Sequence, residues 1–142
     1  MTDTPFEPRI VAFLCNWCTY TAADLAGTSR LVYPANVKII RMMCSGMVDP
    51  KYVIKAFLEG ADGVLIGGCW PGDCHYINGN LKARRRVALL HEVIDQFGIN
   101  QERLWLRWVA ASEGNMFAET VNDMTIKLRE MGPNPLREKM IA

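Results

Sequence analysis

Four short apolar runs, separated by longer segments with helical spacing, limit the folds open to this chain more than any other feature. The runs are rich in aliphatic and β-branched residues. They are Ile10–Leu14, Val37–Met43, Gly63–Gly67 and Leu104–Val109. Continuous apolar runs of this length are typical of strands buried on both faces of a parallel sheet. We therefore expect four buried strands.

The segments between these runs carry the signals of helices. Asp49 and Pro50 form an N-cap followed by proline at the first helical position, and Gly60 ends that helix. A second helix is predicted over Leu81–Phe97, with Gly98 as its stop. The last helix has apolar residues at alternating spacings of four and three. They are Phe117, Val121, Met124, Leu128 and Met131.

The alternation of strands and helices defines the fold class. With a further helix over Thr19–Arg30, the order is β-α-β-α-β-α-β-α. This order predicts a doubly wound α/β fold with a small, mostly parallel four-stranded sheet and flanking helices. The 142 residues contain no internal repeat and no linker, so we expect a single domain over 1–142, with short flexible ends at about 1–8 and 133–142.

Composition excludes several classes of function. Sixteen basic and fifteen acidic residues give a net charge of +1, which is not the basic excess of a nucleic-acid-binding protein. The apolar runs are too short to span a bilayer, and the first residues lack the pattern of a secretory signal. The expectation is a cytoplasmic protein that binds neither nucleic acid nor membrane.

Five cysteines follow the first three predicted strands. Cys15 and Cys18 come after the first, Cys44 after the second, and Cys69 and Cys74 after the third. An odd number of cysteines without an export signal argues against a disulfide framework. Ligands of open α/β sheets bind beyond the carboxyl ends of the strands, so we expect the five thiols to meet at one edge.

Three kinds of site are compatible with such a thiol cluster. Structural zinc prefers four thiolates, usually from two Cys-x-x-Cys loops, and only Cys15 and Cys18 have that spacing. A thioredoxin-like dithiol would use the same pair and leave the other three cysteines without a role. An iron–sulfur cluster uses four thiolates and needs nearby glycines, whose backbone amides can approach the sulfur atoms. The candidate glycines are Gly46, Gly67, Gly68 and Gly72.

The three cysteine motifs together resemble one known family. Cys-Asn-Trp-Cys occupies 15–18, Met-Cys-Ser-Gly-Met-Val occupies 43–48, and Gly-Gly-Cys-Trp-Pro-Gly-Asp-Cys-His-Tyr occupies 67–76. This frame is similar to the delta subunit of methyl-viologen-reducing hydrogenase, from about Arg9 to Gly132. The resemblance implies a non-catalytic electron-transfer subunit with one 2Fe-2S cluster. It also implies a bridge, in methanogenesis, from a nickel–iron hydrogenase (through its small subunit) to the flavin-bearing subunit of heterodisulfide reductase.

A cluster with four ligands leaves one of the five cysteines spare. Cys15 lies at a strand end, whereas Cys18 lies on the way into the next helix, so Cys18 is the predicted spare thiol or an alternative to Cys15. The expected ligands are Cys15, Cys44, Cys69 and Cys74. Cys18, Gly68 and Gly72 are expected to contact the cofactor.

Other residues around the cysteines have competing interpretations. His75 is expected to form hydrogen bonds or lie on the surface rather than bind metal. Trp17 and Trp70 could shield a cluster, contact a partner or pack in the core. Lys82 and Arg84–Arg86 form a basic run that is either a solvated helix face or a docking surface for an acidic partner. The nucleotide-binding and hydrolase motifs that we sought are missing from the sequence.

Overall fold

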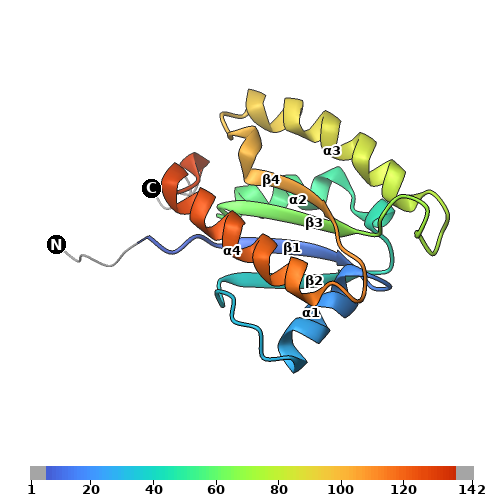
Figure 1. Cartoon of the computed structure of the whole chain (residues 1–142). Coiled ribbons are helices and arrows are strands. Elements are labelled where there is room, and N and C mark those ends of the chain that lie inside the picture. Colours follow the sequence, from blue (N-terminus) through green and yellow to red (C-terminus); the bar gives the residue numbers. More distant parts are fainter. Residues whose placement is uncertain (1–5, 137–142) are drawn as a thin grey trace.

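A computed structural model describes residues 6–136 and contains a parallel four-stranded sheet with helices on both faces (Figure 1). The strands are β1 (Ile10–Cys15), β2 (Val37–Met42), β3 (Gly63–Gly68) and β4 (Leu104–Trp108). The α-helices are α1 (Thr19–Thr28), α2 (Pro50–Leu58), α3 (Gly79–Gln96) and α4 (Gly114–Met131). Short 3-10 helices span Ser45–Met47 (η1) and Gln101–Arg103 (η2). The predicted α/β fold is confirmed, and the sheet is parallel throughout.

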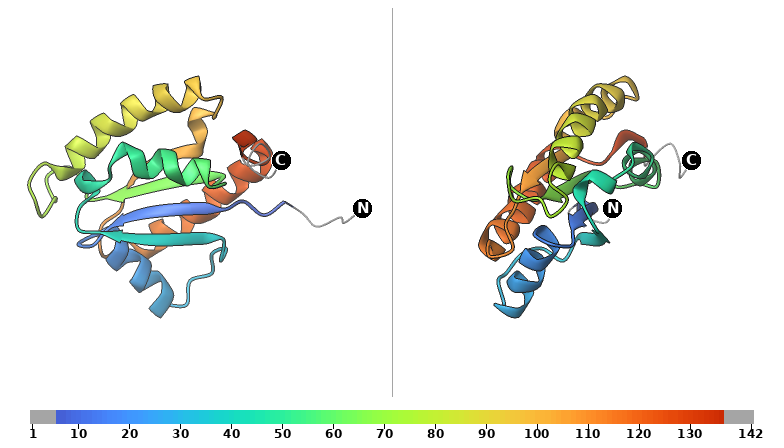
Figure 2. Two further views of the ribbon diagram at one scale, coloured as in Figure 1. Left: turned by 180° about the vertical axis from the view of Figure 1, so that it is seen from behind. Right: turned by 90° about the vertical axis from the view of Figure 1, so that its right-hand side faces the viewer.

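The strand order is β2-β1-β3-β4, so the chain first moves to one side of β1 and then crosses to the other. In register, Ile10 lies opposite Val37 on one side and Gly63 on the other. Right-handed crossovers in opposite directions place helices on opposite faces. Accordingly α1 and α4 pack together on one face, and α2 and α3 cover the other (Figure 2). The winding direction reverses between β1 and β3, the point at which such folds bind ligands.

Two separate cores explain why β1 is a continuous apolar run. Ile10 and Leu14 point toward α1 and α4, where they pack with Phe117. Phe13 points toward α2 and α3, where it packs with Val64. Successive residues of a strand face opposite sides of a sheet, so a strand covered on both sides needs apolar residues at every position.

Local signals fix most helix boundaries. The side chain of Asp49 accepts a hydrogen bond from the N–H of Lys51 at 2.8 Å, so Asp49 is the N-cap of α2 as predicted. Gly60 and Gly98 follow α2 and α3 with φ of +102° and +83°, a conformation that glycine adopts without steric cost. No helix among residues 6–136 combines the length and the apolar character needed to cross a bilayer.

A buried polar cluster, the Asp62 anchor, holds the C-terminal end of the described chain. It consists of Asp62, Arg103 and Asn134, all with almost no exposed surface. The carboxylate of Asp62 accepts a hydrogen bond from the N–H of Asn134 at 2.8 Å. Asn134 is therefore held by hydrogen bonds, although it lies within the end that was predicted to be flexible. Residues 1–5 and 137–142 of the predicted flexible ends lie outside the described residues.

Candidate metal centre

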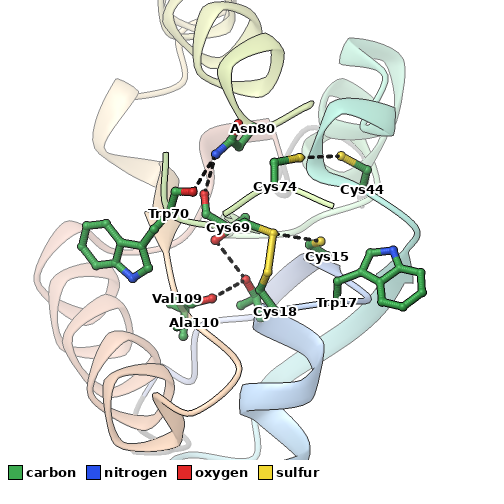
Figure 3. The surroundings of a disulfide bond; sticks show 12 residues. Cys15, Trp17, Cys18, Cys44, Cys69, Trp70, Cys74, Asn80, Val109 and Ala110 are labelled. Atoms are coloured by element: carbon green, nitrogen blue, oxygen red, sulfur yellow. Dashed lines mark hydrogen bonds between the residues drawn. A yellow bond between two sulfur atoms is a disulfide. The ribbon is translucent and has the colours of Figure 1, made fainter. Parts of the chain in front are cut away.

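The five cysteines lie on the three loops that follow β1, β2 and β3 (Figure 3). Cys15 is the last residue of β1 and Cys18 is the N-cap of α1. Cys44 is the N-cap of η1, and Cys69 follows β3 directly. Cys74 lies farther along the same loop, before α3. All three loops extend from the carboxyl edge of the parallel sheet, so the topology alone brings the thiols together.

Three of the sulfur atoms form the buried inner group. The Sγ atoms of Cys15 and Cys69 are 3.7 Å apart, and Cys18 and Cys69 form a disulfide. The Sγ atoms of all three residues lie within 4.8 Å of one another. The sequence did not predict this disulfide. It differs from the expectation of unpaired cysteines, and it links the loops that follow β1 and β3.

Cys44 and Cys74 form a second pair beside the inner group. Their Sγ atoms are 3.9 Å apart. Cys44 is buried, whereas Cys74 is partly exposed and packs against Cys15, Cys18 and Cys69. The outer pair therefore closes the site toward the β2 and α3 sides.

The thiol of Cys44 is the harder one of this pair to ionise. Burial raises the pKa of Cys44, and the hydrogen bond from the Gly46 N–H partly offsets this rise. The nearby sulfurs of Cys74 and Cys15 raise the pKa further. The Gly46 N–H donates to the Cys44 Sγ at 3.4 Å. In the free pair, therefore, Cys44 keeps its proton more firmly than an exposed thiol does.

The thiol of Cys74 shifts in the opposite direction. Burial acts to raise the pKa of Cys74, but hydrogen bonds from the backbone N–H groups of Asn80 and Tyr76 act against it. The Cys44 thiol and the Gly79 N–H add to that stabilisation of the thiolate, and the net pKa is lowered. Backbone amides of the loop and of the first turn of α3 thus favour a thiolate at this position.

The glycines near the sulfur atoms have different roles. A Cβ on Gly79 would lie 2.1 Å from the Cys44 Sγ, and a Cβ on Gly68 would lie 2.8 Å from the Ser45 Oγ. Both positions therefore need glycine because their neighbours approach closely. Gly72 has open space around it and a φ of +93°, so its requirement is the backbone conformation of an exposed turn.

Two polar side chains shape the β3–α3 loop and its surroundings. The fully buried Asn80 donates from Nδ2 to the carbonyl oxygens of Cys69 and Trp70, at 2.9 and 3.0 Å (Figure 3). The sequence carries no signal for this clamp, because Asn80 lies in an Asn-Gly-Asn stretch that is typical of a turn. Arg86, which was assigned to the basic run, donates to the carbonyl oxygen of Gly46 and so ties α3 to η1.

Aromatic side chains flank the thiols on two sides. Trp17 lies on the side of Cys15 and Cys44 (Figure 3). Its ring stacks on the ring of His75, with centroids 3.9 Å apart. Trp70 lies on the opposite side (Figure 3). Its Nε1 donates to the Glu113 carboxylate at 2.6 Å. The Ala110 N–H and the Trp70 N–H lower the pKa of Glu113. Both tryptophans keep a substantial exposed surface, 43% for Trp17 and 39% for Trp70, so neither is a core residue.

The donor set matches the chemistry of a soft, thiolate-binding metal centre. Thiolate ligands select zinc, copper(I) or iron–sulfur clusters rather than hard cations. Two thiolates bound to one tetrahedral metal at about 2.3 Å are about 3.8 Å apart. The Cys15–Cys69 and Cys44–Cys74 separations of 3.7 and 3.9 Å both agree with this value. The residues present therefore fit a thiolate-bound metal group.

Comparisons with known proteins agree with this site. Residues 10–132 match the profile of one family, described as methyl-viologen-reducing hydrogenase, delta subunit. The chain is 53% identical, over 94% of its length and 92% of the relative's, to the vhc iron-sulfur subunit of the F420-non-reducing hydrogenase of Methanococcus voltae. It is 50% identical to the F420-non-reducing hydrogenase iron-sulfur subunit of Archaeoglobus profundus, over 90% of this chain and 93% of that one.

A third relative is much longer than this chain. It is a polypeptide of the ferredoxin/F420H2-dependent CoB–CoM heterodisulfide reductase of Methanosarcina acetivorans, called the long reductase chain below. The similarity covers 89% of this chain but only 16% of the long reductase chain, at 50% identity. A segment like this chain therefore occurs there as part of a larger polypeptide.

Proposed function

The chain belongs to the family of methyl-viologen-reducing hydrogenase delta subunits, and on that premise we propose that it is an electron-transfer subunit holding one 2Fe-2S cluster. The observation that carries the proposal is the convergence of five cysteine sulfur atoms on one edge of the sheet. Relatives at 53% and 50% identity are named iron-sulfur subunits. A 2Fe-2S cluster accepts and releases one electron at a time, and four thiolates hold it.

The proposed ligands are Cys15 and Cys69 for one iron, and Cys44 and Cys74 for the other. Cys69 can bind iron only after two electrons have reduced the Cys18–Cys69 disulfide to two thiols, as a reducing compartment allows. Each pair already has the sulfur separation that a single tetrahedral metal requires, 3.7 Å in the first pair and 3.9 Å in the second. Cys18 is the proposed spare thiol. Its position as the N-cap of α1 supports this role, because it precedes the helix rather than ending a strand.

The rest of the site would exclude water and stabilise negative charge. Cys15, Cys44 and Cys69 are buried to at least nine-tenths, so a group held by them is shielded from solvent. The Gly46 N–H points at Cys44, and the Asn80 N–H stabilises the Cys74 thiolate. Backbone amides aimed at cysteine sulfurs raise the reduction potential of a bound cluster, because they favour the more negative state.

The proposed position of the chain is between two larger redox proteins. Its relatives are hydrogenase subunits and heterodisulfide reductase polypeptides, which supports an association with both kinds of complex. We infer electron flow from the small subunit of a nickel–iron hydrogenase, through this chain, to the flavin-bearing subunit of heterodisulfide reductase in methanogenesis. A reducing cytoplasm is the proposed location, since it keeps the ligand thiols available for the cluster.

One observation favours a second candidate function, a thiol–disulfide oxidoreductase. The Cys18–Cys69 disulfide lies beside the Cys15 thiol, whose Sγ is 3.7 Å from the Cys69 Sγ, within reach for exchange. This function would leave Cys44 and Cys74 without a role. The two pairs of sulfur atoms at metal-like distances, which include those of Cys44 and Cys74, therefore favour the cluster.

Analysis of anaerobically purified protein tests the proposal. We expect about two irons and two acid-labile sulfides per chain, with visible charge-transfer absorption and an electron paramagnetic resonance signal on reduction. A result of one zinc per chain and no sulfide would show that the site holds a structural metal instead of a cluster. A colourless, metal-free protein that reduces disulfides would establish the second candidate instead.

A further inference from the structure

We propose that the exposed aromatic surface beside Cys74, together with the basic start of α3, docks an acidic face of a heterodisulfide reductase polypeptide of the long reductase type. This inference rests on the proposed electron-transfer function and adds to it the surface that contacts the reductase. The surface, called the Trp17 patch below, consists of Trp17, His75, Tyr76 and Ile77.

The three aromatic side chains of the Trp17 patch are held together and stay exposed. Trp17 stacks on His75, His75 meets the Tyr76 ring edge-on at 5.0 Å, and the Trp17 Nε1 lies 3.4 Å from the Tyr76 hydroxyl. Trp17 is 43% exposed and Tyr76 is 46% exposed. Pre-packed aromatic rings at the surface lose little side-chain freedom when a partner covers them, and tryptophan and tyrosine are enriched among residues that dominate binding.

Ile77 gives an independent indication of a role outside the fold. Its φ is +70°, a conformation that is unfavourable for a β-branched residue, and its side chain is 85% exposed. Neither burial nor local geometry therefore accounts for an isoleucine at this position. Strained residues concentrate at functional sites, and a contact with a partner would account for an apolar side chain here.

The neighbouring helix supplies positive charge. Lys82, Arg84 and Arg85 lie on the first two turns of α3, directly after the Trp17 patch in sequence, and their side chains reach solvent. None of them forms an ion pair with another residue in the range 6–136. Arg86 differs, because it is half-buried and bonded to the Gly46 carbonyl. An apolar centre beside unpaired cations fits a partner face with an apolar pocket and acidic residues.

The longer relatives indicate which partner carries that face. In Methanosarcina acetivorans and Methanosarcina mazei, a segment similar to this chain is 16% of a heterodisulfide reductase polypeptide. The described ends of this chain lie at the amino ends of the strands, opposite the cysteine loops (Figure 1). A covalent connection at either end would thus leave the Trp17 patch free to contact the remainder of such a polypeptide.

The test measures binding of the cluster-loaded chain to the heterodisulfide reductase polypeptide of the same organism that is similar to the rest of the long reductase chain. Binding to this polypeptide, and in parallel to the small subunit of the hydrogenase, is measured without oxygen at low and high salt. Trp17→Ala is expected to weaken binding by at least about tenfold. The double variant Lys82→Glu with Arg85→Glu should weaken binding by about tenfold at low salt and less at high salt, because salt screens exposed charges.

A third variant separates the contact from the fold. Ile77→Gly should weaken binding severalfold, because it removes the apolar side chain that the partner would cover. The urea midpoint of unfolding should stay the same or rise, since glycine relieves the positive φ.

Matched controls lie at the opposite end of the molecule. Phe97→Ala removes another exposed aromatic ring, just after the far end of α3, and Lys38→Glu reverses a charge at the start of β2. Both should bind within about twofold of the wild-type chain, because neither touches the Trp17 patch. Iron and sulfide are measured in every sample.

The outcomes separate this proposal from the proposed function. Binding unchanged in Trp17→Ala and Ile77→Gly, in samples with full iron content, overturns the docking surface and leaves the cluster in place. If the variants weaken binding only to the small subunit of the hydrogenase, the choice of occupant is overturned. Absence of iron and sulfide in the wild-type chain overturns the proposed function, and the docking surface with it.

Discussion

The two ends of the parallel sheet bury polar atoms in opposite ways. At the amino end, the Asp62 anchor pairs its polar atoms with other groups of the same chain, except for the Arg103 Nε. At the carboxyl end, five sulfur atoms converge, and backbone N–H groups are aimed at two of them, those of Cys44 and Cys74. Buried polar groups normally have partners. The first end is therefore nearly complete within the chain, whereas the second has the donor set of a site that takes a ligand.

Hydrogen bonds to the main chain satisfy most of the buried polar groups at the amino end. The side chain of Asn134 donates to the carbonyl oxygens of Phe57 and Ala61 at 3.0 and 2.8 Å, and Asp62 accepts from the Arg9 N–H at 2.8 Å. Arg103 donates to the Asp62 carbonyl oxygen at 2.9 Å. Burial lowers the pKa of Arg103, and the negative charge of Asp62 acts against that shift. These contacts close the amino end of the sheet without any added group.

Replacing single thiols should produce the largest effect, complete loss of the cluster. Cys44→Ser, Cys69→Ser and Cys74→Ser each remove one of four ligands, and hard oxygen is a poor replacement for thiolate. We expect the visible absorption and the electron paramagnetic resonance signal of the reduced protein to disappear in each variant.

Cys18→Ala is the matched control, because it removes a thiol from the same edge without removing a proposed ligand. Its signal should stay close to that of the wild-type chain. A lost signal in Cys18→Ala together with a retained one in Cys15→Ala would exchange the roles of these two residues. A retained signal in Cys44→Ser would show that the thiols at the three strand ends do not share one site.

The asymmetry between the two ends also explains what the sequence could predict. The strands were predicted to within a few residues because a strand covered on both faces leaves an unbroken apolar run, as at Ile10–Leu14. The convergence of the thiols followed from topology, since parallel strands place their carboxyl ends at one edge. Both features depend on local pattern and chain order alone.

Contacts between distant segments left no comparable signal. The predicted helix began at Leu81, but α3 begins at Gly79, where the turn-like Ile77–Asn80 stretch concealed the start of the helix. Gly79 packs against Cys44 because η1 and α3 lie together, and this depends on tertiary structure. The Asp62 anchor was missed for the same reason, because its members are far apart in sequence.

Asp62→Ala should have the next largest effect, a loss of stability at the amino end only. It leaves the Arg9 and Asn134 N–H groups without their acceptor and removes the negative charge near the buried Arg103. Breaking such a buried charged network costs about 3–5 kcal/mol of unfolding free energy. Urea unfolding followed by circular dichroism measures this loss.

Asp123→Ala, at an exposed position on α4, is the control and should change stability by no more than about 0.5 kcal/mol. The folded Asp62→Ala protein should still contain its iron and sulfide. Loss of iron from folded Asp62→Ala would mean that the two ends of the sheet are coupled and do not act independently.

Gly79→Ala should have the smallest effect of the three changes, and it acts on the boundary between the fold and the site. The new Cβ would lie 2.1 Å from the Cys44 Sγ and 3.4 Å from the Cys74 Sγ, so the outer thiol pair must shift. Overpacking of this kind typically costs about 1–3 kcal/mol of unfolding free energy. Because the displaced atoms are proposed ligands, a chelator should also remove iron faster from Gly79→Ala than from the wild-type chain.

Gly27→Ala in α1 is the matched control, because nothing lies within 4 Å of its new Cβ. It should raise the free energy of unfolding by up to about 1 kcal/mol and leave the rate of iron release unchanged. If Gly79→Ala retained iron as long as Gly27→Ala, the outer pair would not hold the metal.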